Sequence, residues 1–252
     1  MKSRLLKCLL CFLSAVFLWV PTALAIPVGL ELSLLLDVSG SISASEYNLQ
    51  MQGYATAFQS QAIKDAIDAN PTGKIAVNMI QWSSSSQQSQ VIGWTEVTSA
   101  TANSFGNTIL GLSRAFSSTT APQSAMSYAA STIGNGFEAP RQLIDISGDG
   151  VANSGDRTGD SGRVAALAAG YDTINGLVIG GDSTVFNYYQ NYVIGGNNAF
   201  ITTASTFNDF GDAIALKLER EIKPIPEPSS ILLLGIGLLS LAGYGRKKYR
   251  NK

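Results

Sequence analysis

Short apolar runs alternate with helical patterns along most of this chain of 252 residues. The runs are typical of buried strands, and the stretches between them carry apolar residues three or four positions apart, as amphipathic helices do. This alternation predicts an α/β fold, a doubly wound three-layer sandwich around a mostly parallel central sheet. A polar turn joins two strands as a hairpin, so one edge strand should be antiparallel. We expect strands at residues 30–36, 74–82, 90–94, 141–147, 173–179 and 199–203, and helices at 43–70, 99–116, 123–133, 159–169 and 205–221.

Both ends of the chain carry targeting patterns. Residues 1–25 have a basic start, an apolar centre and small residues at Ala23 and Ala25, which predicts a cleaved secretory signal peptide. A retained membrane anchor is the alternative. Near the other end, a Pro-Glu-Pro tripeptide at 226–228 precedes an apolar run and a basic tail. The run is short for a transmembrane helix, which needs about 17–25 residues. The basic tail would stay on the cytoplasmic side, so that the body of the protein faces outward.

The tripeptide, the apolar run and the basic end, in this order, resemble the PEP-CTERM sorting signal of Gram-negative bacteria. The resemblance implies export across the inner membrane, transient anchoring there, cutting by an exosortase-type protease, and then a place at the cell surface or outside the cell, in a biofilm. A plain C-terminal anchor is the alternative. We therefore divide the chain into a signal peptide (1–25), one domain (26–222), a Pro-rich linker (223–230) and a hydrophobic helix with a basic tail (231–252).

The part of the chain between these ends is acidic. The chain has 17 basic and 18 acidic residues. Three of the basic residues lie in the signal and five in the tail, and Glu227 leaves with the tail. Residues 26–225 therefore keep 9 basic and 17 acidic residues, a net charge of −8. That charge argues against nucleic acid or anionic lipid as a partner and suits a secreted protein that binds a cation.

The residue types that are missing restrict the chemistry further. The chain has no histidine, and its two cysteines, Cys8 and Cys11, lie inside the signal. A Ser–His–Asp or Cys–His catalytic group is therefore excluded, and zinc lacks its usual ligands. Any metal must be a hard ion held by oxygen atoms.

Three segments carry compact oxygen donors. The stretch from Asp37 to Ser41 reads D-V-S-G-S and follows the strand at 30–36, Thr119 and Thr120 precede a helix, and Asp149 follows the strand at 141–147. Parallel strands direct such loops to one edge of the sheet, so we expect these side chains to meet. Two carboxylates with neutral hydroxyls would leave a bound Mg²⁺ able to attract a further carboxylate.

Together these segments resemble the metal-ion-dependent adhesion site of von Willebrand factor type A domains, over residues 28–222. The third segment is most similar to an uncharacterised bacterial subgroup. The resemblance implies a binding and adhesion module that holds Mg²⁺ (or Ca²⁺ or Mn²⁺) and binds an acidic group of a protein or matrix partner. Thr119 stays open as an alternative to Thr120, because serines replace the family's usual glycine before the threonine. The implied metal ligands are Asp37, Ser39, Ser41, Thr120 and Asp149.

Other interpretations remain. Ser41 and Ser43 could cap the next helix, and Asp145 competes with Asp149 as the second carboxylate. The protein could be a structural matrix protein without a working ion. An enzyme, a phosphatase or other hydrolase with Asp37 as nucleophile, is a third hypothesis. It lacks a second aspartate two positions on, a partner lysine and a phosphate-binding G-x-x-x-x-G-K-[ST] loop, so we expect no enzymatic activity.

Two further features have alternative interpretations. The run from Asn187 to Tyr192 is aromatic and polar, and it fits either an amphipathic helix or the rim of a binding site. Asp156 and Asp160 fit either a second cation site or an ordinary solvated loop.

Overall fold

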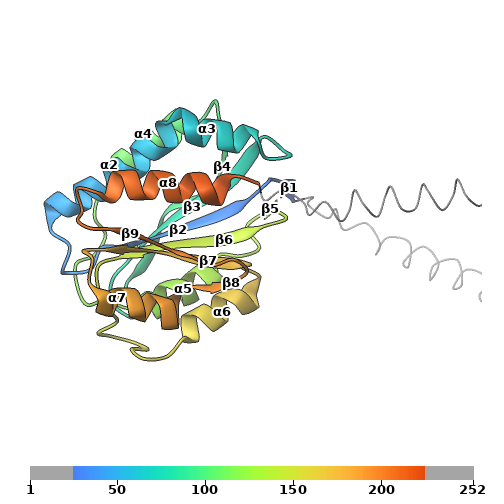
Figure 1. The fold of residues 1–252 in the computed structure, drawn as a ribbon. Helices are drawn as coiled ribbons and strands as arrows, with labels where there is room; N and C mark the ends of the chain where they lie inside the picture. The colour runs from blue at the N-terminus through green and yellow to red at the C-terminus, as the bar shows by residue number, and fades with distance from the viewer. Residues whose placement is uncertain (1–24, 225–252) are drawn as a thin grey trace, which may run out of the picture.

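A seven-stranded sheet forms the centre of the computed structural model, which describes residues 25–224 (Figure 1). Its order is β4-β3-β2-β6-β7, and both β8 and β9 pair with the outer side of β7. The strands are β2 (Glu31–Asp37), β3 (Lys74–Trp82), β4 (Gln88–Thr98), β6 (Gln142–Gly148), β7 (Thr173–Ile179), β8 (Gly195–Gly196) and β9 (Ile201–Ala204). All neighbours pair in parallel except β3–β4 and β7–β8. A separate two-stranded parallel pair joins β1 (Ile26–Pro27) to β5 (Phe137–Glu138).

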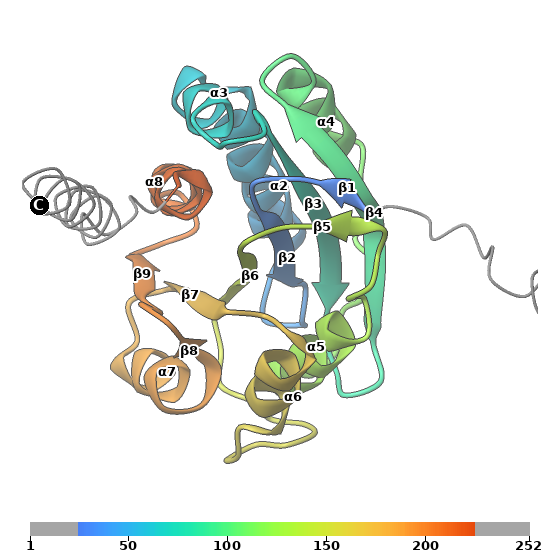
Figure 2. The ribbon, with the colours of Figure 1, turned by 90° about the vertical axis from the view of Figure 1, so that its right-hand side faces the viewer.

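Helices cover both faces of the sheet (Figures 1 and 2). One face carries α2 (Ala44–Gln59), α3 (Gln61–Asp68), α4 (Ala102–Leu110) and α8 (Phe210–Ile222). The other carries α5 (Pro122–Ala130), α6 (Ser161–Ala169) and α7 (Ser183–Tyr188), which continues as a π-helical turn, η1 (Tyr189–Val193). The predicted doubly wound, three-layer α/β sandwich is confirmed.

The apolar run of β2 shows why the chain adopts this architecture. Leu34 and Leu36 pack into the core under α2 and α8, whereas Leu35 packs into the core under α5. Successive side chains of a strand point to opposite faces, so only a strand covered on both sides needs such a continuous apolar run. Residues 25–224 contain a seven-stranded sheet, two helical layers and two apolar cores, so we expect this segment to fold by itself.

At least three predicted helices were wrong in extent, and the one expected at 205–221 begins only at Phe210. The helix expected at 43–70 is two helices, because Ser60 is extended (φ −69°, ψ 152°) and its hydroxyl accepts the Ile63 N–H that begins α3. The helix expected at 99–116 ends at Leu110. Beyond it, Gln81 holds the chain in an irregular course, with its amide oxygen accepting from the Ala115 N–H at 2.7 Å. The break at Ser60 has no glycine or proline beside it, whereas α4 ends directly before Gly111, its C-cap.

The antiparallel edge strand predicted from the hairpin is confirmed as β4, and the short β8 adds a second antiparallel pair that was not predicted. Within residues 25–224, no helix combines the length and the apolar character that a bilayer crossing requires. The expected signal peptide and the expected hydrophobic C-terminal helix lie outside the described residues, apart from Ala25.

Candidate metal centre

The two carboxylates of the predicted cluster lie at the ends of neighbouring strands. Asp37 is the last residue of β2, and Asp149 follows the last residue of β6 directly. The strands are parallel partners, with Leu36 opposite Ser147. Both chain segments therefore leave the sheet at the same edge, which brings the two acidic side chains toward each other.

A continuous set of polar contacts joins the five predicted residues. The Ser39 N–H donates to Asp37 Oδ1 at 2.7 Å, and the Thr120 hydroxyl donates to Ser39 Oγ at 3.2 Å. Ser39 Oγ also lies 3.2 Å from Ser41 Oγ, which in turn donates to Asp149 Oδ1 at 2.8 Å. The structure thus brings together all five side chains that the sequence nominated, from three separate segments.

Asp37 is the most constrained member of this cluster. Its side chain is fully buried, and among the described residues its Oδ2 atom has no hydrogen-bond partner. Burial raises the pKa of Asp37 from 3.8 to about 7, since the hydrogen bonds from Ser39 only partly offset it and the charge of Asp149 raises it further. Burial also raises the pKa of Asp149. A buried carboxylate oxygen without a partner is costly, and a bound cation would satisfy it.

The donor set fits a hard divalent cation. It consists of two carboxylates and three hydroxyls, all oxygen, as Mg²⁺ and Ca²⁺ prefer. Within residues 25–224 no group of three or more His, Cys, Asp and Glu side chains is arranged to hold a metal ion. A site here therefore depends on the serine and threonine hydroxyls as well as on the acids.

The loop that carries the serines is held from behind by a residue that the sequence did not nominate. Arg114 donates to the carbonyl of Val38 at 2.9 Å and to that of Ser39 at 2.6 Å. The Gly40 N–H donates to the Ser118 carbonyl at 2.6 Å. These contacts fix the backbone and leave the hydroxyls to face the cluster. The sequence carried no signal for Arg114, because the residue binds backbone carbonyl groups and no sequence motif indicates such a contact.

Gly148 leaves room for a second residue that sequence reasoning missed. A Cβ atom at Gly148 would lie 2.6 Å from the hydroxyl oxygen of Tyr189 and 2.9 Å from Asp37 Oδ2. The Tyr189 hydroxyl is buried and, among the described residues, lacks a hydrogen-bond partner. The glycine thus permits the η1 turn to reach the cluster. The only signal in the sequence was the tyrosine-rich run itself.

The residues that the sequence left as alternatives make their contacts outside the cluster. The Thr119 hydroxyl donates to Ser154 Oγ at 2.9 Å, so Thr120, and not Thr119, contacts the cluster. Ser43 caps α2 in a capping box with Glu46. Asp145 lies 2.8 Å from the ammonium group of Lys217 in the core.

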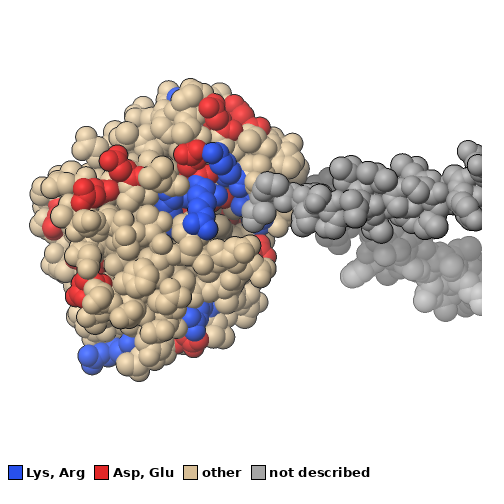
Figure 3. Space-filling model, in the orientation of Figure 1, with Lys and Arg blue, Asp and Glu red and all other residues tan. Residues whose placement is uncertain are grey.

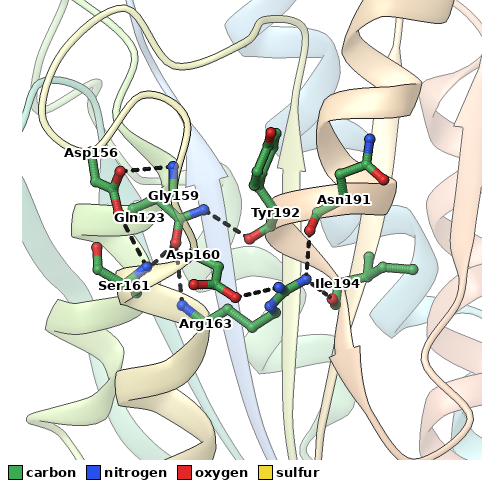
Figure 4. A network of polar contacts seen from close by, with 10 residues as sticks. Gln123, Asp156, Gly159, Asp160, Ser161, Arg163, Asn191, Tyr192 and Ile194 are labelled. Atoms are coloured by element: carbon green, nitrogen blue, oxygen red, sulfur yellow. Dashed lines mark hydrogen bonds and ion pairs between the residues drawn. The ribbon is translucent and has the colours of Figure 1, made fainter.

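The loop after Asp149 uses its other acidic residues internally. Asp156 accepts the N–H groups of Gly159 and Ser161, and Asp160 pairs with Arg163 (Figure 4). These contacts are those of an ordinary loop, in which the carboxylates bind neighbouring groups of the chain.

The family comparison covers most of the chain. Residues 27–226 match the family described as "Protein of unknown function (DUF1194)". The chain belongs to the DUF1194 family. Residues 224–248 of this DUF1194 protein match the PEP-CTERM protein-sorting motif, which confirms the sorting signal and implies export and surface sorting by an exosortase. No curated protein matches it.

Solved structures show the fold of the DUF1194 domain. Proximal thread matrix protein 1 from the mussel byssus is 16% identical, with a TM-score of 0.56, over 77% of this chain and 48% of that one. The chain thus spans about half the length of the byssus protein. A second structure of that protein, with a zinc-occupied MIDAS motif, gives 16% identity and a TM-score of 0.53 over 76% and 46%.

Two bacterial proteins of known structure are also similar in fold to this chain. A von Willebrand factor type A protein from Catenulispora acidiphila is 13% identical, with a TM-score of 0.55 over 78% of this chain and 43% of that one. The vWF domain of the pilus tip protein Mfa5 from Porphyromonas gingivalis is 13% identical, with a TM-score of 0.52 over 81% and 100%. The DUF1194 domain therefore has a von Willebrand factor type A-like fold.

Proposed function

We propose that this domain is an exported binding module that holds a divalent cation and, through it, an acidic group of a protein or matrix partner. When bound, the ion supplies a positive charge with an open position for a carboxylate, because neutral hydroxyls leave most of its charge uncompensated. Mg²⁺ is the first choice, with Ca²⁺ or Mn²⁺ as alternatives. The residues that would hold the ion are Asp37, Ser39, Ser41, Thr120 and Asp149.

One observation carries this proposal: the partnerless Oδ2 atom of the fully buried Asp37, within a cluster that also holds three hydroxyls. A chain that needed only to cap a helix at this point would not bury a carboxylate there, and the cap of α2 is provided by Ser43. The zinc-occupied MIDAS motif of the byssus protein supports a divalent cation in a domain of this fold. The oxygen-only donor set favours a harder ion than zinc.

The surface charge supports attraction through an ion. On the face seen in Figure 3, most Lys and Arg side chains gather near the end of α8, away from the edge where β2 ends. Acidic side chains are spread over the rest of this face. A cation bound at the cluster would therefore add positive charge to an edge of the sheet that has little of its own.

We infer a binding role and not a catalytic one. A phosphoryl-accepting aspartate must present its carboxylate to the substrate, whereas the Asp37 side chain is fully buried. The sorting signal supports a partner outside the cell. We propose that residues 1–25 are removed on export, that 223–230 link the domain at 26–222 to the tail, and that 231–252 anchor the protein in the inner membrane until sorting.

Thermal melting of residues 26–224 tests the proposal. An ion at 100 times its Kd stabilises the native state by about 2.7 kcal/mol, which raises the Tm of a domain of this size by about 5–10 °C. We expect this rise with Mg²⁺ relative to EDTA, and none in Asp37→Ala. The matched control Asp156→Ala, in a loop carboxylate, should keep it. Equal melting with Mg²⁺ and EDTA would favour a structural matrix protein without a working ion.

A further inference from the structure

A pocket lies near the oxygen cluster, between the loop after β6 and the helical turns of α7 and η1. Its volume is about 570 Å³, within the range of small-molecule sites. We name it the tyrosine pocket. The residues on which its chemistry depends are Val151, Arg157, Asn187, Tyr188, Asn191 and Tyr192.

The tyrosine pocket lies close to the cluster, because two of its lining residues stand near cluster residues in the chain. Val151 lines the pocket and stands two residues after Asp149, so their Cα atoms are at most about 7 Å apart. From the other side, Tyr189 reaches Gly148 beside Asp37, while its neighbour Tyr188 lines the pocket. The cluster and the pocket are therefore near enough for one extended ligand to contact both.

The backbone behind the pocket is fixed. Arg163 donates to the Asn191 carbonyl at 2.8 Å and to the Ile194 carbonyl at 3.1 Å, and Gln123 donates to the Tyr192 carbonyl at 2.8 Å. Figure 4 shows the Asn191 amide and the Tyr192 ring on the same side of the turn, pointing away from Arg163. The side chains of this turn are thus presented on a rigid support, as a binding site requires.

These side chains are not used within the fold. Asn187 and Asn191 are exposed, and among the described residues neither side-chain amide has a hydrogen-bond partner. Arg157 is exposed and, within residues 25–224, forms no ion pair. Tyr192 is half-buried, with its ring 5.4 Å from that of Tyr188. The pocket offers two amides that both donate and accept, one cation and an aromatic ring.

A sugar is the ligand whose chemistry fits these amides, this cation and this aromatic ring. The faces of a pyranose ring are apolar and pack on aromatic rings, while its hydroxyls donate and accept as the two amides do. A peptide anchored by an aliphatic side chain would find only Val151 and Ala152 as aliphatic contacts in this wall. The carboxylate that a bound ion would hold must then belong to the same sugar or to its neighbour in an oligosaccharide.

We propose that the tyrosine pocket binds the ring of an acidic sugar, a hexuronate within an oligosaccharide, whose carboxylate meets the ion at the cluster. This rests on the proposed function. Tyr192 packs on the ring face, Asn187 and Asn191 bind hydroxyls, and Arg157 binds a neighbouring carboxylate. The partner of the domain is then an acidic polysaccharide of the matrix.

Titration of residues 26–224 with a trimer of galacturonic acid in Mg²⁺ tests this. We expect binding by the wild type, at least tenfold weaker binding by Asn191→Ala and by Tyr192→Ala, and unchanged Mg²⁺ affinity in both. Asn103→Ala, at an exposed asparagine of α4, is the matched control and should bind like the wild type. A neutral galactose trimer should not bind.

Three results would overturn the pocket assignment while Mg²⁺ still binds: no binding of the acidic trimer, equal binding by Asn191→Ala, or tighter binding of an acetylated aspartate peptide than of the sugar. Absence of Mg²⁺ binding by the folded wild type would overturn the proposed function and this inference with it, so the two failures are distinguishable.

Discussion

The hydroxyl of Ser41 donates a 2.8 Å hydrogen bond to Oδ1 of Asp149, a residue 108 positions further along the chain. The contact joins the loop after β2 to the loop after β6, and these strands are parallel neighbours in the sheet. It shows that the D-V-S-G-S stretch does more than begin a helix, because its last serine faces the second acidic loop.

Asp149→Asn should weaken Mg²⁺ binding at least tenfold. The substitution removes one of two negative charges and keeps an oxygen that can accept from Ser41. Asp156→Asn alters a carboxylate that accepts from Gly159 and Ser161 and, among the described residues, forms no hydrogen bond with the cluster, so it serves as the control. Calorimetric titration of both variants measures the effect, and equal affinities would remove Asp149 from the site.

Gly148→Ala should destabilise the domain by about 1–3 kcal/mol, the usual cost of overpacking. The new methyl group would lie 2.6 Å from the Tyr189 hydroxyl oxygen. Adding Tyr189→Phe removes that atom and should restore part of the stability. Gly93→Ala is the control, since a Cβ there meets nothing within 4 Å. Urea unfolding measures all four proteins, and equal effects at Gly148 and Gly93 would contradict the close approach of Tyr189.

Lys217→Met should be strongly destabilising, by about 3–5 kcal/mol. The buried Lys217 ammonium group lies 2.8 Å from Asp145 and 2.5 Å from Glu221, and both carboxylates are buried with it. Without the cation, two buried acids remain. Lys223→Met breaks a pair in which the lysine is exposed, with Glu219, and should change the free energy of unfolding by less than about 1 kcal/mol. A small effect at both positions would mean that the buried cluster is not an ion pair.

Glu221→Gln should reduce the loss of stability that accompanies rising pH. Burial raises the pKa of Glu221 from 4.5 to about 8, against the opposing effect of Lys217, and the nearby Asp145 raises it further. The unfolded chain releases this proton near pH 4.5 and the folded chain near pH 8, so the free energy of unfolding falls across that window. Unfolding of both proteins at saturating Mg²⁺ between pH 4.5 and 8 isolates the contribution of Glu221. Parallel pH profiles would show that Glu221 does not hold its proton in the fold.

The sequence predicted the fold class well because each buried strand is a marked apolar run. Leu34–Leu36 had to be covered on both faces, and this alone favours a parallel sheet between two helical layers. The helix boundaries were harder. The break at Ser60 depends on a hydroxyl that caps α3, and the irregular course after α4 depends on Gln81, which contacts residues more than thirty positions away.

Part of the candidate site was also predictable, because four of its residues stand next to predicted strands. Asp37, Ser39, Ser41 and Asp149 stand next to strand ends in the sequence, so topology alone directs them to one edge. Arg114 and Tyr189 do not, because they reach the cluster from an irregular segment and from a π-helical turn. Their places follow from packing between elements, which local patterns do not encode.

The central claim is that the buried carboxylate of Asp37 serves a divalent cation. Isothermal titration of residues 26–224 with Mg²⁺ tests it most directly, with Asp37→Ala beside the wild type and Ser43→Ala, the cap of α2, as the control in the same loop. The account predicts one ion per chain in the wild type and in Ser43→Ala, and no measurable binding in Asp37→Ala. Absence of binding in the folded wild type, or equal affinity in Asp37→Ala, would contradict it.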